Sequence, residues 1–145
     1  MTVNLAKLQM TQTIDMRCMR QLNLFERITG VRTKSCFIYN RTLIFAVPQA
    51  SISRAIGSQA ENIKRLASIL GQKIRVIALP KNNVKRFILD LIAPIKIDSV
   101  EDYATTIEIS ASTQSKAALI GRNKVRLEEL EKITKDVLGK ELRVI

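Results

Sequence analysis

One pattern occurs twice in this chain, at an offset of 64 residues, and it constrains the fold more than any other feature. When Gly57 is aligned with Gly121, segments 43–57 and 107–121 correspond without a gap. Each segment starts with alternating apolar residues, which predict a strand with one buried face, and ends with a short helix that stops on Ile-Gly. The alternating residues are Leu43, Phe45 and Val47 in the first copy and Ile107, Ile109 and Ala111 in the second; Ser51 and Thr113 or Ser115 are the candidate helix caps.

The correspondence continues beyond the two glycines. Apolar residues at helical spacing follow each one and lead to Gly71 and Gly139, which stand where a helix commonly ends. Short apolar strands are predicted next, over 73–79 and 141–145. The second helix is expected to be one turn longer, since four more residues separate its glycines.

A further helix precedes each segment. The first is stopped by Gly30, and its counterpart is capped by Asn82 or Asn83 and closed by Pro94. The first helix has Thr13 as its candidate cap and an apolar stripe of Ile14, Cys18, Leu22, Phe25 and Ile28.

The first strand of each predicted hairpin completes the unit. These strands are expected over 35–40 and 95–100, with turns over 39–42 and 101–104. The sequence thus predicts an α+β fold of two units, each α-β-β-α-α-β with a three-stranded sheet. We place them at residues 1–80, where 1–11 form a frayed helix start, and 81–145. The connection over 80–83 is too short for a flexible tether, so we expect a fixed mutual orientation.

Charge indicates an anionic partner. The formal net charge is +11 and the pI is about 10.1. Residues 1–80 hold twelve Lys or Arg against three acids, whereas residues 81–145 hold twelve against ten, so the first unit carries most of the excess. Nucleic acid is the first candidate partner, a membrane surface the second, and a merely solubilising basic surface the bland alternative.

Several function classes are disfavoured. The chain has no histidine, the commonest general base and a frequent metal ligand, so we predict neither an enzyme nor a metal site, and no cofactor or small-molecule substrate. Cys18 and Cys36 lack a CxxC spacing and are expected to be reduced, mostly buried thiols. We find no membrane-spanning run or signal peptide and expect a cytoplasmic protein without membrane association.

The glycine segments resemble the signature of the KH domain, Ile-Gly-x-x-Gly-x-x-Ile/Leu. The two copies run from Ile56 to Ile63 and from Ile120 to Leu127, with Ala60 and Lys124 where the family has its second glycine. The order of elements resembles the type II, prokaryotic form. This resemblance implies that each loop clamps the backbone of single-stranded RNA at a helix N-terminus while bases lie in an apolar groove.

The resemblance implies a set of RNA-binding residues. Ala60 is expected at helix position N1, where a methyl group is tolerated, and Lys124 is expected to contact a phosphate with the help of Arg122. Ile56, Ile63, Ile120 and Leu127 are expected to pack in the core, with a secondary role in lining the groove. The candidate residues are Gly57, Ser58, Gln59, Ala60, Lys64 and Arg65 in the first unit and Gly121, Arg122, Asn123, Lys124 and Arg126 in the second.

Nearly the whole chain from residue 11 onward resembles the archaeal NusA family. The segments that carry the likeness include 54–77 and "ALIGRNKVRLEEL". This resemblance implies single-stranded RNA as partner, a transcription complex or RNA polymerase as a further one, and a role in transcription termination or antitermination. The alternatives are a KH protein of ribosome assembly or RNA processing, a protein-interaction scaffold with degenerate KH clefts, and, less favoured, a DNA-reading helix-turn-helix.

Overall fold

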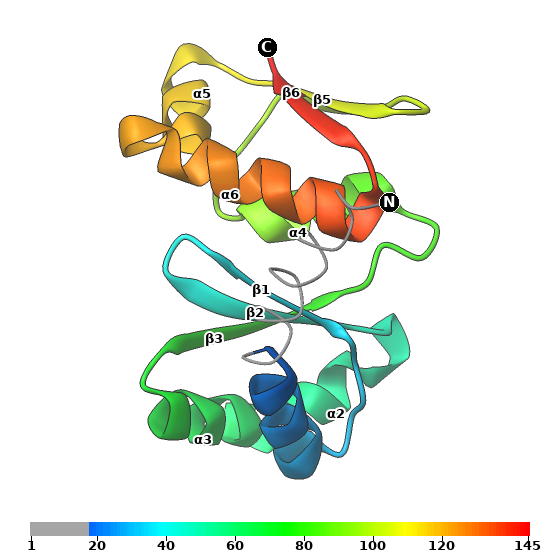
Figure 1. Ribbon diagram of the computed structural model, residues 1–145, viewed down its shortest axis with the longest axis vertical. Coiled ribbons are helices and arrows are strands. Elements are labelled where there is room, and N and C mark those ends of the chain that lie inside the picture. Colours follow the sequence, from blue (N-terminus) through cyan, green and yellow to red (C-terminus); the bar gives the residue numbers. More distant parts are fainter. Residues whose placement is uncertain (1–17) are drawn as a thin grey trace, which may run out of the picture.

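The computed structural model describes residues 18–145 and contains two three-stranded sheets, each flanked by helices (Figure 1). In the first unit, a helix over 18–29 precedes β1 (Ser35–Tyr39), β2 (Thr42–Val47), α2 (Ile52–Ile56), α3 (Glu61–Leu70) and β3 (Lys73–Ala78). In the second, the order is α4 (Val84–Ile92), β4 (Ser99–Asp102), β5 (Thr106–Ser110), α5 (Thr113–Ile120), α6 (Val125–Ile133) and β6 (Glu141–Val144). The predicted α+β class and order of elements are confirmed; the expectations for Thr13, Ile14 and residues 1–11 lie outside the described residues.

The two sheets have the same topology and register. In each, the first two strands form an antiparallel hairpin and the third runs parallel to the middle strand. Ile44 pairs with Arg75 in the first sheet, and Glu108 pairs with Arg143 at the equivalent place in the second. The repeat read from the sequence is therefore a repeat of three-dimensional structure.

The units stack in four alternating layers, as Figure 1 shows. The helix over 18–29, α2 and α3 cover one face of the first sheet, α4 and α6 lie against its other face, and the second sheet lies beyond them. Under the first helix layer, Phe25 and Phe45 stack with ring centroids 4.2 Å apart. This core also contains Val31, Leu43, Val47, Ala55, Leu66 and Ile74.

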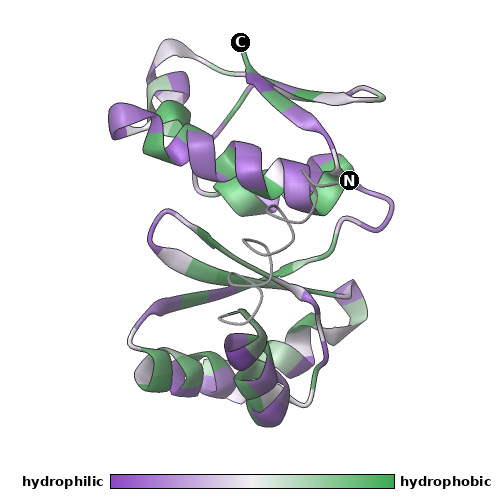
Figure 2. Ribbon diagram, in the orientation of Figure 1, coloured by the Kyte–Doolittle hydropathy of each residue, from purple (hydrophilic) through white to green (hydrophobic). Residues whose placement is uncertain are grey.

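A second and larger core joins the two units. Ile44 and Ala46 of β2 pack in it with Phe87 and Ile88 of α4, and β2 and α4 are coloured as largely apolar in Figure 2. We call this contact between the two units the seam. Across it, Arg75 donates a hydrogen bond to the carbonyl oxygen of Leu91 at 3.3 Å. The contacts agree with the fixed orientation that the short connection predicts.

The prediction of one buried face is confirmed for β5 but wrong for β2. All six residues of β2 are buried, whereas buried and half-buried residues alternate along β5. The cause is the second unit, which covers the face of β2 that the alternation pattern assigned to solvent.

The hairpin of the second unit is displaced from its predicted place. The predicted strand over 95–100 is instead β4, residues 99–102, and the turn follows at 103–105. The alternating Ile95 and Ile97 pack against the core before strand pairing begins. Pairing, which defines the strand, starts where the amide of Asp98 donates to the carbonyl oxygen of Ser110 at 2.8 Å.

The helix ends agree in part with the predicted caps. Gly30 and Gly71 adopt left-handed backbone angles at helix ends, and Asn83 caps α4 by accepting from the amide of Arg86 at 3.0 Å. The cap of α5 is Ser112, not Thr113 or Ser115, and Ser51 precedes α2 without a side-chain capping bond.

The extra residues of the second unit lie at the end of its last helix. There α6 continues into a π-helical turn, Thr134–Leu138, which ends at Gly139. Four inserted residues slightly exceed one α-helical turn of about 3.6 residues, and the wider π turn takes up the excess. In the part of the chain from residue 18 onward, no helix is long and apolar enough to cross a membrane.

Candidate nucleic-acid interface

The two glycine loops have the same backbone conformation. Gly57 and Gly121 have φ/ψ angles of 80°/171° and 73°/176°. At the third position Gln59 and Asn123 have 54°/34° and 56°/27°, and at the fourth Ala60 and Lys124 have 58°/30° and 61°/18°. A different set of side chains thus supports one loop geometry in both units.

The first position of the loop requires glycine. Its backbone angles fall in a region that residues with a Cβ atom hardly enter. A Cβ atom on Gly57 would also lie 2.9 Å from Nδ2 of Asn62, and one on Gly121 would lie 2.6 Å from Cγ of Arg126. Both copies of the glycine are therefore fixed by sterics, independently of any ligand.

The fourth position adopts the left-handed helical conformation, which corrects the expectation for Ala60. Ala60 is the N-cap of α3 with φ +58°, and not its N1 residue. A residue with a Cβ atom is strained there by roughly 1–2 kcal/mol, which explains why glycine suits this position. The surrounding structure nevertheless holds Ala60 and Lys124 in the same conformation.

Each loop presents two adjacent backbone N–H groups. The amides of Ala60 and Lys124 close the turns by donating to the carbonyl oxygens of Gly57 and Gly121, at 3.2 and 3.3 Å. By contrast, the amides at the second and third positions have no hydrogen-bond partner within the described residues; they belong to Ser58, Gln59, Arg122 and Asn123. They stand at the N-termini of α3 and α6, where the helix dipole favours an anion.

Around the first loop, the predicted side chains are accessible. Ser58, Gln59, Lys64 and Arg65 are all exposed. The loop is braced from behind by Asn62, whose Nδ2 donates to the carbonyl oxygen of Arg54 at 3.1 Å and so ties the start of α3 to α2. The sequence analysis missed Asn62, because an asparagine inside a helix has no periodicity or motif to distinguish it.

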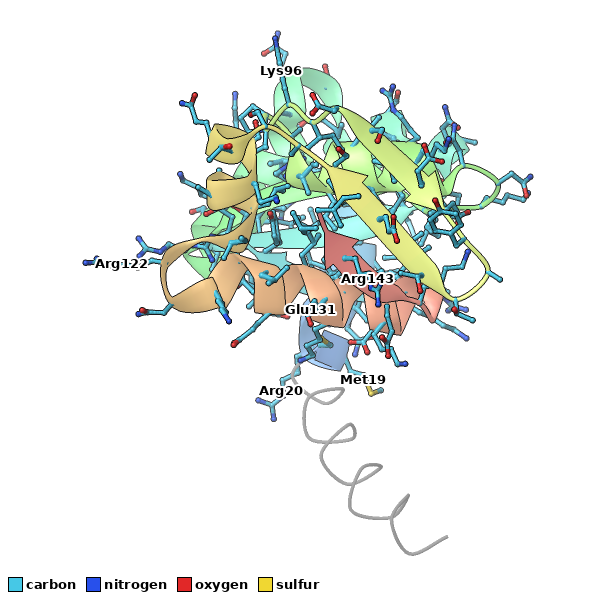
Figure 3. All side chains as sticks on the ribbon, turned by 90° about the horizontal axis from the view of Figure 1, so that it is seen from above. Met19, Arg20, Lys96, Arg122, Glu131 and Arg143 are labelled. Atoms are coloured by element: carbon cyan, nitrogen blue, oxygen red, sulfur yellow. The ribbon has the colours of Figure 1, made fainter. Side chains whose placement is uncertain are left out.

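Around the second loop, the basic residues divide into two groups. Arg122, Asn123 and Lys124 are exposed, and Figure 3 shows Arg122 projecting away from the body of the protein. Arg126, in contrast, forms an ion pair with Glu129 at 2.7 Å and is mostly buried. We therefore assign Arg126 to the support of the loop.

Glu129 connects the second loop to the first unit. Its Oε1 accepts from Arg126 and also from the backbone amide of Asn40, at 3.1 Å, in the turn between β1 and β2. The second loop is thereby anchored on the seam between the units, a relation that no local sequence pattern contains.

The apolar residues that flank the loops are only half-buried. Of the four, Ile63 packs against the core of the first unit. Ile56, Ile120 and Leu127 are half-exposed and do not belong to either core cluster. For these three the expectation of core packing is wrong, and the secondary expectation, an apolar border to the groove, stays a prediction. Among residues 18–145, no cluster of potential metal ligands occurs.

The comparisons with known proteins give partial matches. No protein-family model matches the chain. It is 27% identical over 121 residues to the probable transcription termination protein NusA of Methanocaldococcus jannaschii, covering 79% of this chain and 64% of that protein. It is 31% identical over 80 residues to the protein of the same name from Methanococcus vannielii, covering 55% and 46%.

A solved structure is similar over most of both chains. The crystal structure of APE1850 aligns with a TM-score of 0.63 and 28% identity, covering 88% of this chain and 96% of that one. The alignments to the two named proteins, however, reach less than two thirds of the length of either. The chain is thus related in sequence to parts of archaeal proteins named for transcription termination.

Proposed function

We propose that this protein binds single-stranded RNA through its two glycine loops, as two KH domains at residues 1–80 and 81–145. One observation carries the proposal: the same strained loop recurs in both units although its side chains differ. Strained backbone is retained mainly where the surrounding structure and a function demand it. The four unpaired amides give that geometry a chemical use, since they can donate to phosphate oxygens.

The surroundings of the loops suit a nucleic-acid strand. Lys64 and Arg65 beside the first loop, and Arg122 and Lys124 in the second, can neutralise phosphates as the strand passes. The half-exposed Ile56, Ile120 and Leu127 offer apolar contact to unstacked bases, which only a single strand presents. A binding protein accounts for these features without any catalytic group.

The RNA is proposed to be a nascent transcript, with a transcription complex as the further partner. The support is the similarity to two archaeal proteins named as probable transcription termination proteins. Sequencing the RNA that crosslinks to the protein in its own cells tests this part. Enrichment of nascent transcripts is expected, whereas enrichment of ribosomal RNA supports a role in ribosome assembly or RNA processing instead.

The loops themselves are tested by paired aspartate substitutions. Ser58→Asp with Gln59→Asp places two carboxylates beside the unpaired amides of the first loop, so phosphate is repelled while the core is untouched. We expect RNA affinity to fall roughly tenfold or more at low salt, and the salt dependence of binding to become shallower. Fluorescence anisotropy with a labelled single strand measures both. The matching change in the second loop is Arg122→Asp with Asn123→Asp.

A control variant separates the loops from net charge. Ala104→Asp with Thr105→Asp adds two carboxylates to the exposed β4–β5 turn, away from the second loop (Figure 1). This variant should retain nearly full affinity, and all variants should keep the circular dichroism spectrum of the parent. Equal losses in loop and control variants would contradict a role for the loops.

A further inference from the structure

The two cysteines lie next to each other although 18 positions separate them in the chain. The Cys18 thiol donates to the backbone carbonyl oxygen of Cys36 at 3.7 Å. The Cys36 thiol in turn lies 3.7 Å from Oε1 of Gln21, one turn further along the helix that carries Cys18. Both cysteines are free and half-buried, in place of the mostly buried thiols that the sequence predicted.

The packing of the first unit fixes this neighbourhood. Phe25 of the helix over 18–29 stacks on Phe45, and Phe45 is the cross-strand partner of Cys36. Cys18 and Gln21 lie seven and four positions before Phe25, hence on the same face of the helix. The helix is thus held with Cys18 over β1, and the meeting of the two sulfur-bearing side chains follows from the core.

We propose that Cys18 and Cys36 form a redox-active pair that closes to an intrachain disulfide with a low-molecular-weight disulfide as oxidant. In the first step the Cys18 thiolate attacks one sulfur of the oxidant; a mixed disulfide forms and one small thiol leaves. In the second step the Cys36 thiolate attacks the Cys18 sulfur, so the Cys18–Cys36 bond forms and the second small thiol leaves. The protein loses two protons and two electrons, and the oxidant is reduced to two thiols.

The environments of the two thiols suit this order of attack. Burial, together with the neighbouring Cys18, raises the pKa of Cys36 well above its ordinary value. Cys36 is therefore a poor first nucleophile toward an external oxidant. Once Cys18 has reacted, the Cys36 thiol is already beside its target and attacks it within the protein.

The disulfide would fasten the first helix to an edge strand. β1 pairs with β2 on one side only, and its link to the helix otherwise consists of side-chain packing and the two weak hydrogen bonds of the cysteine thiols. A covalent bond across a loop of this length restricts the unfolded chain considerably. The pair would make the stability of the first unit respond to the thiol–disulfide balance around the protein.

Titration of the full chain with mixtures of reduced and oxidised glutathione tests the proposal. We expect both thiols to become protected from alkylation together, and the intact mass to fall by two hydrogen atoms without a glutathione adduct. Trypsin should then release residues 18–20 joined to residues 35–41, because Arg17, Arg20, Lys34 and Arg41 bound these peptides. The oxidised chain should unfold at a Tm roughly 5–10 °C higher than the reduced one.

Single substitutions provide the control. Cys36→Ser should stop at a glutathione adduct on Cys18, whereas Cys18→Ser should form an adduct on Cys36 far more slowly, and both variants should lose the oxidative rise in Tm. If either substitution impairs folding, the alkylation, mass and peptide measurements on the parent chain are sufficient to test the proposal. Independent protection of the two thiols, stable glutathione adducts on the parent, or disulfide-linked dimers would overturn the proposal.

Discussion

The two units use the same face of their sheets in opposite ways. We call the face that points away from the helices of the sheet's own unit its outer face. In the first sheet this face carries Ile44 and Ala46 on the middle strand, and both side chains are fully buried against the second unit. The equivalent positions in the second sheet are Glu108 and Ser110, which are partly exposed. No described element covers this second face, which Figure 3 views from above with Arg143 on it.

In each sheet the composition of this face matches what lies against it in the described structure, because the covered face is apolar and the uncovered face is polar. If the outer faces of both sheets were apolar, the exposed one would promote association with another protein molecule. For the same reason the terminal units of repeat proteins need a polar outer face. Two arginines at equivalent positions of the two sheets also differ in burial. Arg75 is half-buried and donates to backbone carbonyl oxygens at the end of α4, whereas Arg143, at the same register position, is exposed.

The strongest test exchanges the two faces. Ile44→Glu gives the first sheet the residue of the second and places an unpaired carboxylate in the seam. We expect a loss of about 4 kcal/mol or more in the free energy of unfolding, measured by urea denaturation. A loss below about 1 kcal/mol would mean that the seam opens to water.

The reverse exchange serves as the partner of this test. Glu108→Ile exposes an apolar side chain on the open face, and we expect the fold to persist while sedimentation velocity detects self-association. Glu108→Gln, which removes the charge alone, should stay in the oligomeric state of the parent.

The next largest effect compares two glycines of the first unit. Gly57→Ala puts a methyl group in a backbone region that is nearly closed to it and 2.9 Å from Asn62. We expect a loss of about 2–3 kcal/mol. Gly71→Ala, at a left-handed helix end where no atom beyond the neighbouring residues of the chain lies within 4 Å of the new methyl group, should cost about 1 kcal/mol. Equal costs in thermal or urea unfolding would show that the loop relaxes around the methyl group.

Sequence periodicity predicted the order of the elements because each helix and strand repeats its own pattern. The run from Leu43 to Val47 is apolar throughout, whereas apolar and polar residues alternate in β5. The sequence of β2 therefore already indicates that both of its faces are covered, one of them by the second unit. Glu129, which joins the second loop to Asn40, leaves no such indication in the sequence, because its partner is 89 positions away. The left-handed angle of Ala60 was equally hidden, since polarity does not encode backbone dihedrals.

Two equivalent tyrosines, one in each unit, extend the comparison, and here we expect a smaller change in the free energy of unfolding than for the glycines. Tyr39 and Tyr103 are equivalent under the repeat, but Tyr39 is 3% exposed and Tyr103 is 52% exposed. The buried Tyr39 hydroxyl has no hydrogen-bond partner among the described residues. Tyr39→Phe should therefore raise the free energy of unfolding by about 1 kcal/mol, whereas Tyr103→Phe should leave it unchanged.

The same pair predicts a difference at alkaline pH. Burial raises the pKa of Tyr39 above its ordinary value of 10.0. The neutral hydroxyl is thus favoured in the folded state, so this contribution to stability is complete below pH 10 and is lost as the pH rises further. The advantage of Tyr39→Phe in urea denaturation should grow over that range. An advantage that is independent of pH would mean that the hydroxyl reaches water.

The smallest effect concerns the fourth position of the loops. Ala60→Gly and Lys124→Gly relieve left-handed strain of roughly 1–2 kcal/mol, but glycine also gains freedom in the unfolded chain, which offsets about half of it. We expect each variant to be more stable by about 0.5–1 kcal/mol in urea denaturation.

RNA binding should distinguish Ala60→Gly from Lys124→Gly, because only Lys124→Gly removes a charge. Its salt dependence should become shallower by about one phosphate contact, while Ala60→Gly keeps the slope of the parent. Equal slopes in both variants would mean that Lys124 does not contact the strand, and that the second loop acts through its backbone and Arg122.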